Sequence, residues 1–181
     1  MPLPPGTHEL GPSDGTLAVR TGRTGAAAKA GHDLLLHVTE WRATLEVGED
    51  EAPVRIALEA DPTSFRVREG TGGMQALDDD DKANIEQTID DEVLKRQPIE
   101  FRSTAVRGGD EGRLSVEGEL TLAGNTRPIA FEVAMDENGA LTGSAVLKQS
   151  EWGMKPYSAL FGALKVADDI EVSFEARPAT S

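Results

Sequence analysis

The sequence contains no cysteine in its 181 residues. This excludes disulfides, thiolate metal sites and cysteine nucleophiles, so the fold must be held together by packing. The chain also lacks any apolar run near the roughly 20 residues that a membrane-spanning helix requires. Residues 1–6 have neither a basic leader nor an apolar stretch of signal-peptide length, so we expect a cytoplasmic protein without an integral membrane segment.

Basic side chains are scarce, because 18 lysine and arginine residues stand against 32 aspartate and glutamate residues. The formal net charge of −14 produces a field that repels a phosphate backbone, so nucleic acid is not an expected partner. Aromatic residues make up only 4% of the chain, while hydrophobic residues of all kinds make up 38%. That content is enough for one globular domain with a full core.

The chain divides into a lead-in, one domain and a tail. Residues 1–14 are rich in proline and glycine and show no period, which indicates a flexible N-terminal lead-in. From Leu17 onward, apolar and polar residues alternate with period two, the mark of strands with one buried face. We therefore predict a β-barrel domain over residues 15–177 and a C-terminal tail over residues 178–181. The clearest alternating sets begin at Trp41, Val54, Ile99, Leu114, Ile129 and Ile170.

Turn-forming residues separate these sets, so consecutive strands should pair as antiparallel hairpins. One segment has helical spacing instead, because Ile85, Ile89 and Val93 follow an aspartate run that suits a helix N-terminus. Pro98 then stops the pattern, which predicts a helix from about residue 81 to residue 96. Residues 152–161 lack alternation and indicate a loop or a short helical turn.

About eight alternating strands with one apolar face must hide that face, and a sheet closed on itself does so without bare edges. The predicted fold is all-β, a closed antiparallel eight-stranded barrel with one helix. Such a barrel is just wide enough to be filled by side chains or to hold one small ligand. Gly143 and Ala145 on the inner parity favour an open lumen, whereas large side chains reaching across would fill it. Strand parity alone predicts these further lining residues: Leu45, Ile56, Leu58, Phe101, Leu114, Val116, Phe131, Val133 and Phe174.

The three histidines do not form a recognisable metal motif. His8 lies in the predicted lead-in, and His32 and His37 would face opposite sides of one continuous strand. We therefore expect no metal site. His32 could stand at the barrel mouth and hydrogen-bond the head group of a ligand, or it could be a half-exposed residue that pairs with Asp33.

No catalytic constellation is visible. The sequence has no Gly-x-Ser-x-Gly elbow, and its carboxylates mostly occupy the polar parity of strands, where they face water. The glycine-rich residues 70–73 meet neither phosphate-binding fingerprint and indicate a mobile loop. We expect no enzyme activity and no cofactor. Residues 78–82, DDDDK, match an enterokinase cleavage sequence but lead directly into the helical pattern, so we interpret them as native.

Three segments together resemble the YceI-like polyisoprenoid-binding family. They are residues 97–103 with a proline before an alternating Phe-x-Ser strand, residues 118–129 with GELTLAGNTRPI, and the late Trp152-Gly153. The resemblance spans about residues 15–177. It implies a lipocalin-like eight-stranded barrel with a helix across it, which binds an isoprenoid chain or a related amphiphile such as a quinone.

Two functional hypotheses follow. The first is a carrier of an apolar, lipid-like small molecule. The second is a non-catalytic interaction or stress-associated barrel with a filled core, in which the apolar residues 34–36 would mark a covered outer wall or a homodimer interface.

Overall fold

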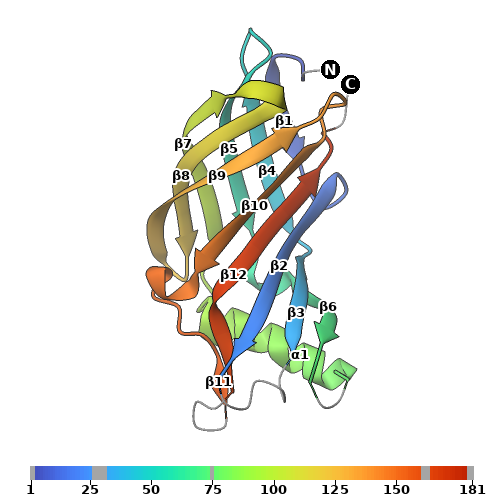
Figure 1. Cartoon of the computed structure of the whole chain (residues 1–181), viewed down its shortest axis with the longest axis vertical. Helices are drawn as coiled ribbons and strands as arrows, with labels where there is room; N and C mark the ends of the chain where they lie inside the picture. The colour runs from blue at the N-terminus through green and yellow to red at the C-terminus, as the bar shows by residue number, and fades with distance from the viewer. Residues whose placement is uncertain (1–2, 26–31, 74–75, 160–163, 179–181) are drawn as a thin grey trace.

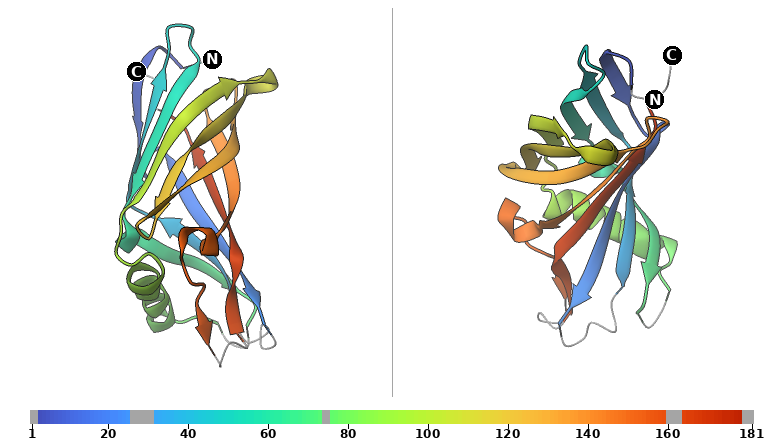
Figure 2. Two further views of the ribbon diagram at one scale, coloured as in Figure 1. Left: turned by 90° about the vertical axis from the view of Figure 1, so that its left-hand side faces the viewer. Right: turned by 45° about the horizontal axis from the view of Figure 1, so that its top comes forward.

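The computed structural model describes residues 3–25, 32–73, 76–159 and 164–178. They form one antiparallel sheet that curls around an apolar interior, with helix α1 (Asp79–Thr88) lying across its lower end in Figure 1. The further views in Figure 2 show the same curl and the same position of the helix. The strands are β1 (Gly6–Leu10), β2 (Gly15–Thr24), β3 (Asp33–Val38), β4 (Trp41–Val47), β5 (Pro53–Ala60), β6 (Phe65–Thr71), β7 (Ile99–Gly108), β8 (Arg113–Leu122), β9 (Asn125–Met135), β10 (Leu141–Lys148), β11 (Ser158–Ala159) and β12 (Leu164–Ala176).

Alternation in the sequence becomes alternation of burial in the strands. In β8 the inward side chains Leu114, Val116 and Leu120 are 5%, 1% and 8% exposed, while the alternate residues Ser115, Glu117 and Glu119 are exposed. Burying each such side chain contributes roughly 1.5–3 kcal/mol. Between β8 and β9, Ala123 and Gly124 both have positive φ, at 50° and 79°, as a two-residue hairpin turn requires. The predicted hairpin pairing is confirmed here.

The strand path runs β1-β4-β5-β7-β8-β9-β10-β12-β2-β3-β6, with β11 paired to β12 off this path. The closed eight-stranded barrel that we predicted is not confirmed, because within the described residues the path ends at β1 on one side and at β6 on the other. The two ends are nevertheless linked, since β3 continues into β4 and β5 into β6. Backbone hydrogen bonds from Thr39 N to Ser64 O and from Asp61 N to Glu40 O cross between these two connections.

Helix α1 confirms the predicted helix with shifted ends. Its N-cap is Asp78, whose side chain accepts a hydrogen bond from Asp81 N at 2.7 Å, while the Asp81 side chain accepts one from Asp78 N. This capping box explains why the helix begins before residue 81. A turn of π-helix, η3 (Ile89–Val93), continues α1, and Lys95 and Arg96 then adopt positive φ before the chain enters β7.

The helix also protects the edge of the sheet at β6. The backbone N–H of Val67 donates to Glu86 Oε1 at 2.9 Å, so a side chain of α1 takes the place of a further strand. Ile85, Ile89 and Val93 pack against the core from the same helical segment. The helix therefore closes off an edge that would otherwise be open to pairing.

The expected lead-in needs correction, because residues 6–10 form strand β1, which pairs antiparallel with β4. Leu3 and Leu10 are only 2% and 5% exposed, so this N-terminal segment belongs to the core. Within this strand only Leu10 is buried, so the sequence carries almost no alternation that would indicate a strand here. An edge strand tolerates such a composition because only one of its edges must pair.

The segment expected to be a loop or a helical turn, residues 152–161, begins where the 3-10 turn η5 (Gln149–Trp152) ends, and it includes the short strand β11. The buried Trp152 is 1% exposed, and its Nε1–H donates to Leu120 O at 2.8 Å. Asn125 Nδ2 donates in turn to Trp152 O at 2.7 Å. These bonds fix the turn against the hairpin of β8 and β9. Residues 160 and 161 lie outside the described residues.

Candidate ligand cavity

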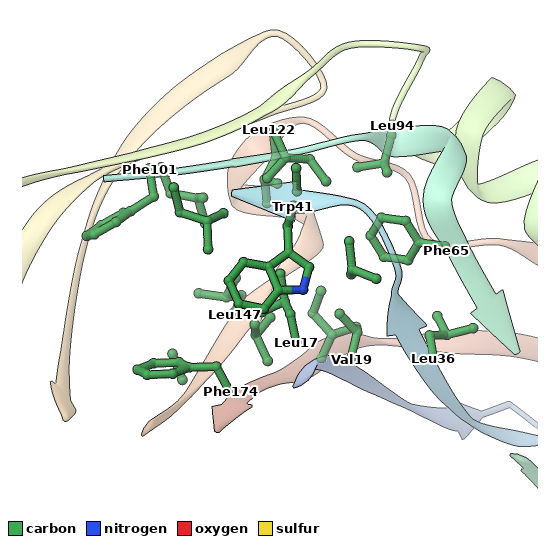
Figure 3. A pocket seen from close by; sticks show the side chains of 18 of the residues that line it. Leu17, Val19, Leu36, Trp41, Phe65, Leu94, Phe101, Leu122, Leu147 and Phe174 are labelled. Carbon is green, nitrogen blue, oxygen red and sulfur yellow. The ribbon is translucent and has the colours of Figure 1, made fainter. Parts of the chain in front are cut away.

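The curled sheet encloses a cavity of about 530 Å³. Side chains from β2 to β10, from β12 and from α1 line it, and Figure 3 shows leucine, valine and aromatic side chains converging on it from several strands. The volume is within the roughly 300–1,000 Å³ that is usual for small-molecule pockets. The interior of the curled sheet is thus open over part of its length.

Most of the residues predicted to line a lumen do line this cavity. The structure brings the following predicted residues to the cavity: His32, Leu45, Ile56, Leu58, Phe101, Leu114, Phe131, Val133, Ala145 and Phe174. The other two predicted residues, Val116 and Gly143, do not line it. Val116 is 1% exposed and packs within the inner layer without reaching the empty space.

Gly143 was predicted to line the lumen because a small inner residue was expected to leave space for a ligand, and neither expectation is correct. A Cβ placed on it would lie 2.6 Å from Cε1 of Phe174, because the Phe174 ring already occupies the space beside this glycine. Gly118 accommodates the ring of Phe101 in the same way, with a would-be Cβ at 2.6 Å from Cε2. Glycines on the inner face therefore receive aromatic rings from the neighbouring strand and leave no extra room for a ligand.

The three phenylalanines form a connected wall. The ring centroids of Phe101 and Phe131 are 5.5 Å apart, and those of Phe131 and Phe174 are 6.5 Å apart with an edge-on geometry. Such tilted and edge-to-face contacts are favourable beyond the area that they bury. A rigid aromatic wall is thus built across β7, β9 and β12.

Several lining residues were not predicted as such, although the sequence carried a signal for some of them. Leu17 and Val19 share one parity in β2, and Leu34 and Leu36 share one in β3. The helical residues Ile85, Ile89 and Val93 cover the lower end of the cavity. Their apolar spacing predicted a helix, but which strands the helix would cover depends on tertiary packing.

Polar lining side chains gather at the lower end of the cavity. Thr21 and Arg23 come from the end of β2, His32 precedes β3, and Asn84 and Thr88 lie on α1. The other polar lining residues are Thr44, Ser144, Gln149 and Tyr157, and the rest of the lining is apolar. The cavity is therefore mainly apolar, and five of its nine polar lining residues come from the elements at its lower end.

Gly72 and Gly73, which follow β6, lie against the side chains of Arg23 and His32 at this end of the cavity. Gly72 and Gly73 have φ of 80° and 74°, and a Cβ on them would lie 2.5 Å from Arg23 Nη1 and 2.5 Å from His32 Nε2 respectively. Asp33 forms an ion pair with Arg23, at 3.0 Å between Oδ1 and Nε. Because these two glycines have no side chain, they leave room for the guanidinium of Arg23 and the imidazole of His32 at this end of the cavity.

His32 and His37 face opposite sides, as predicted. His32 lines the cavity, whereas His37 lies on the outer face of β3 between Ala18 and Arg66 of the neighbouring strands. Burial lowers the pKa of His37, and Arg68 lowers it further while Glu69 opposes them. Among the described residues, no group of three or more His, Cys, Asp or Glu side chains is placed to hold a metal ion.

A family model for the YceI-like domain matches residues 20–177. The chain belongs to the YceI-like family. This family is known as polyisoprenoid-binding. A search of curated proteins gives no match.

Solved structures support the same assignment of the fold. BcnA from Burkholderia cenocepacia superposes with a TM-score of 0.64 at 15% identity, over 89% of this chain and 94% of BcnA. The YceI protein of Campylobacter jejuni gives a TM-score of 0.57 at 14% identity, over 81% of this chain and 84% of that protein. At such identities the comparison establishes the YceI-like fold alone. None of the described helices is long and apolar enough to cross a membrane.

Proposed function

We propose that this protein binds an elongated, mainly apolar small molecule, an isoprenoid or a related amphiphile, inside its curled sheet. The observation that carries the proposal is the cavity of about 530 Å³, apolar along most of its length and polar at one end. An amphiphile with a hydrocarbon chain and a small polar group has matching chemistry. Membership of a polyisoprenoid-binding family supports the same class of ligand.

The alternative of an interaction barrel with a filled core fits the cavity less well. Protein interiors are packed about as densely as organic crystals and hold few voids larger than a water molecule. A volume of about 530 Å³ is far above the roughly 30 Å³ that one water occupies in the liquid. On the outer wall, Leu34 and Leu36 turn inward and only Leu35 remains, so the apolar outer face predicted for a homodimer shrinks to one residue.

The titratable groups also favour binding over catalysis. Catalytic carboxyl groups are often identified by a pKa shifted toward neutrality within a pocket. Here the pKa values of Asp61 and Asp168 are lowered, by hydrogen bonds from Thr63 and Ser150 respectively, and neither residue lines the cavity. Their hydrogen bonds stabilise turns between strands.

The direct test is organic extraction of the purified protein followed by mass spectrometry, with fluorescence titration of an apolar probe into the extracted protein. We expect a co-purified lipid-like molecule and saturable binding of the probe at one site per chain, with the probe displaced by the extracted lipid. A protein that releases no lipid and does not bind the probe would refute the proposal.

A further inference from the structure

The most informative group in the cavity is the indole of Trp41, the first residue of β4. This side chain is 8% exposed and lines the cavity, and its Nε1–H has no hydrogen-bond partner among the described residues. Figure 3 shows the indole in the middle of the lining side chains, and the labelled neighbours around its nitrogen, Val19 and Phe65 among them, are pure hydrocarbon.

The other tryptophan of the chain provides the contrast. Trp152 is also buried, but its Nε1–H is satisfied by Leu120 O at 2.8 Å. Buried donors in native proteins are almost always paired, because leaving one unpaired costs its full desolvation. The unpaired donor at Trp41 therefore calls for an explanation, and its position in a cavity supplies one.

We propose that Trp41 Nε1 donates a hydrogen bond to a neutral acceptor oxygen of the bound ligand, so that Trp41 selects ligands that carry a carbonyl-type oxygen within the hydrocarbon part of the cavity. The inference rests on the proposed function and adds a specificity determinant to it. The side chains labelled around Trp41 in Figure 3 are hydrocarbon, whereas buried waters make about three hydrogen bonds, so a ligand oxygen is the favoured acceptor.

The charge distribution explains why the acceptor must be neutral. A buried carboxylate or phosphate needs a cation close by, since an unpaired charge in an apolar medium is strongly disfavoured. The guanidinium that lines the cavity is Arg23 at its polar end, and Arg23 is already paired with Asp33. Trp41 lies on a different strand, where β3 passes into β4, beside Ala60 of β5. A carbonyl oxygen accepts one N–H there without bringing a charge.

The test uses two probes with one carbon skeleton: menadione, which carries quinone carbonyl oxygens, and methylnaphthalene, which carries none. The chain has two tryptophans, so a proton–nitrogen spectrum of the labelled protein contains two indole N–H signals, assigned with Trp41→Phe. We expect menadione to move the Trp41 indole proton signal downfield, as a new hydrogen bond does. Methylnaphthalene should cause no such downfield shift. Both probes contain a fused benzene ring, so methylnaphthalene also controls for the ring-current shift that this ring causes.

Affinities give the second measurement. Trp41→Phe keeps an aromatic ring and removes the donor, so it should weaken menadione about 3- to 10-fold and change methylnaphthalene less than about 2-fold. Trp152→Phe is the matched control and should change the affinity for neither menadione nor methylnaphthalene. Binding of both probes with no downfield shift, or an equal loss for both probes in Trp41→Phe, would overturn the role of Trp41 and leave the carrier function standing. Failure of the wild type to bind either probe would instead overturn the carrier function.

Discussion

Filling the cavity from within should separate ligand binding from stability. Ala145 of β10 is half-buried, lines the cavity and lies opposite Val172 of β12. In a core packed to crystal density, Ala145→Phe would overpack the interior and cost roughly 1–3 kcal/mol or more. In a cavity of about 530 Å³ the new ring has space, and the apolar surface that it buries offsets its strain. We expect the free energy of unfolding to change by less than about 1 kcal/mol.

The same ring occupies the volume that a ligand needs. We expect Ala145→Phe to weaken binding of an apolar fluorescent probe at least about 10-fold, equivalent to about 1.4 kcal/mol. The control is Val146→Phe on the same strand, where the side chain is 66% exposed on the outer face, so stability and binding should both stay near wild type. Chemical denaturation of ligand-free protein and probe titration give the two measurements. Strong destabilisation by Ala145→Phe, together with an absence of probe binding in the wild type, would show that the interior is filled and refute the reasoning.

Three further outcomes follow from local geometry. Gly118→Ala should lower the denaturation midpoint more than Gly143→Ala, because its Cβ would meet a backbone carbonyl oxygen at 2.4 Å, whereas the shortest such contact at Gly143 is 3.1 Å; equal midpoints would contradict this. Enterokinase should cut after Lys82 much faster in denaturant than in the native protein, because the site lies in a capped helix that must first open; equal rates would mean that the helix is not docked. The pKa of Asp61 is lowered by hydrogen bonds from Thr63, so its stabilising effect is full above the ordinary carboxyl range and lost as the pH falls through the lowered value. The stability advantage of the wild type over Asp61→Asn should therefore shrink from about pH 6 to about pH 2.5, and an advantage that grows on acidification would contradict the assignment.

The sequence predicted best what depends on period and on local chemistry. The parity of β8 predicted which side chains point inward, and the spacing of Ile85 and Ile89 predicted the helix, because both patterns follow from backbone geometry alone. The aspartates before that helix were recognised as suited to its N-terminus, and Asp78 is indeed its cap. Opposite faces for His32 and His37 followed from the same two-residue period.

Features that depend on pairing between distant strands were harder to predict from the sequence. Alternation states which face of a strand is buried, but it does not state which strand is its neighbour. The ends of the path at β1 and β6 were therefore missed. The pairing of Arg23 with Asp33 joins β2 to β3 through side chains, and the position of these groups at the cavity end depends on the curl of the whole sheet. The unpaired donor of Trp41 is invisible in sequence for the same reason, since only the surroundings of a side chain decide whether it has a partner.

The volume of the cavity follows from how large and small residues oppose each other across strands. A glycine on the inner face indicates space only until a neighbouring ring moves into it, as Phe174 does at Gly143 and Phe101 does at Gly118. At these two positions the small residue accommodates a ring and leaves no space for a ligand. Ala145 differs, because it lines the cavity itself. A small residue on the inner face therefore indicates room for a ligand only where no neighbouring ring covers it.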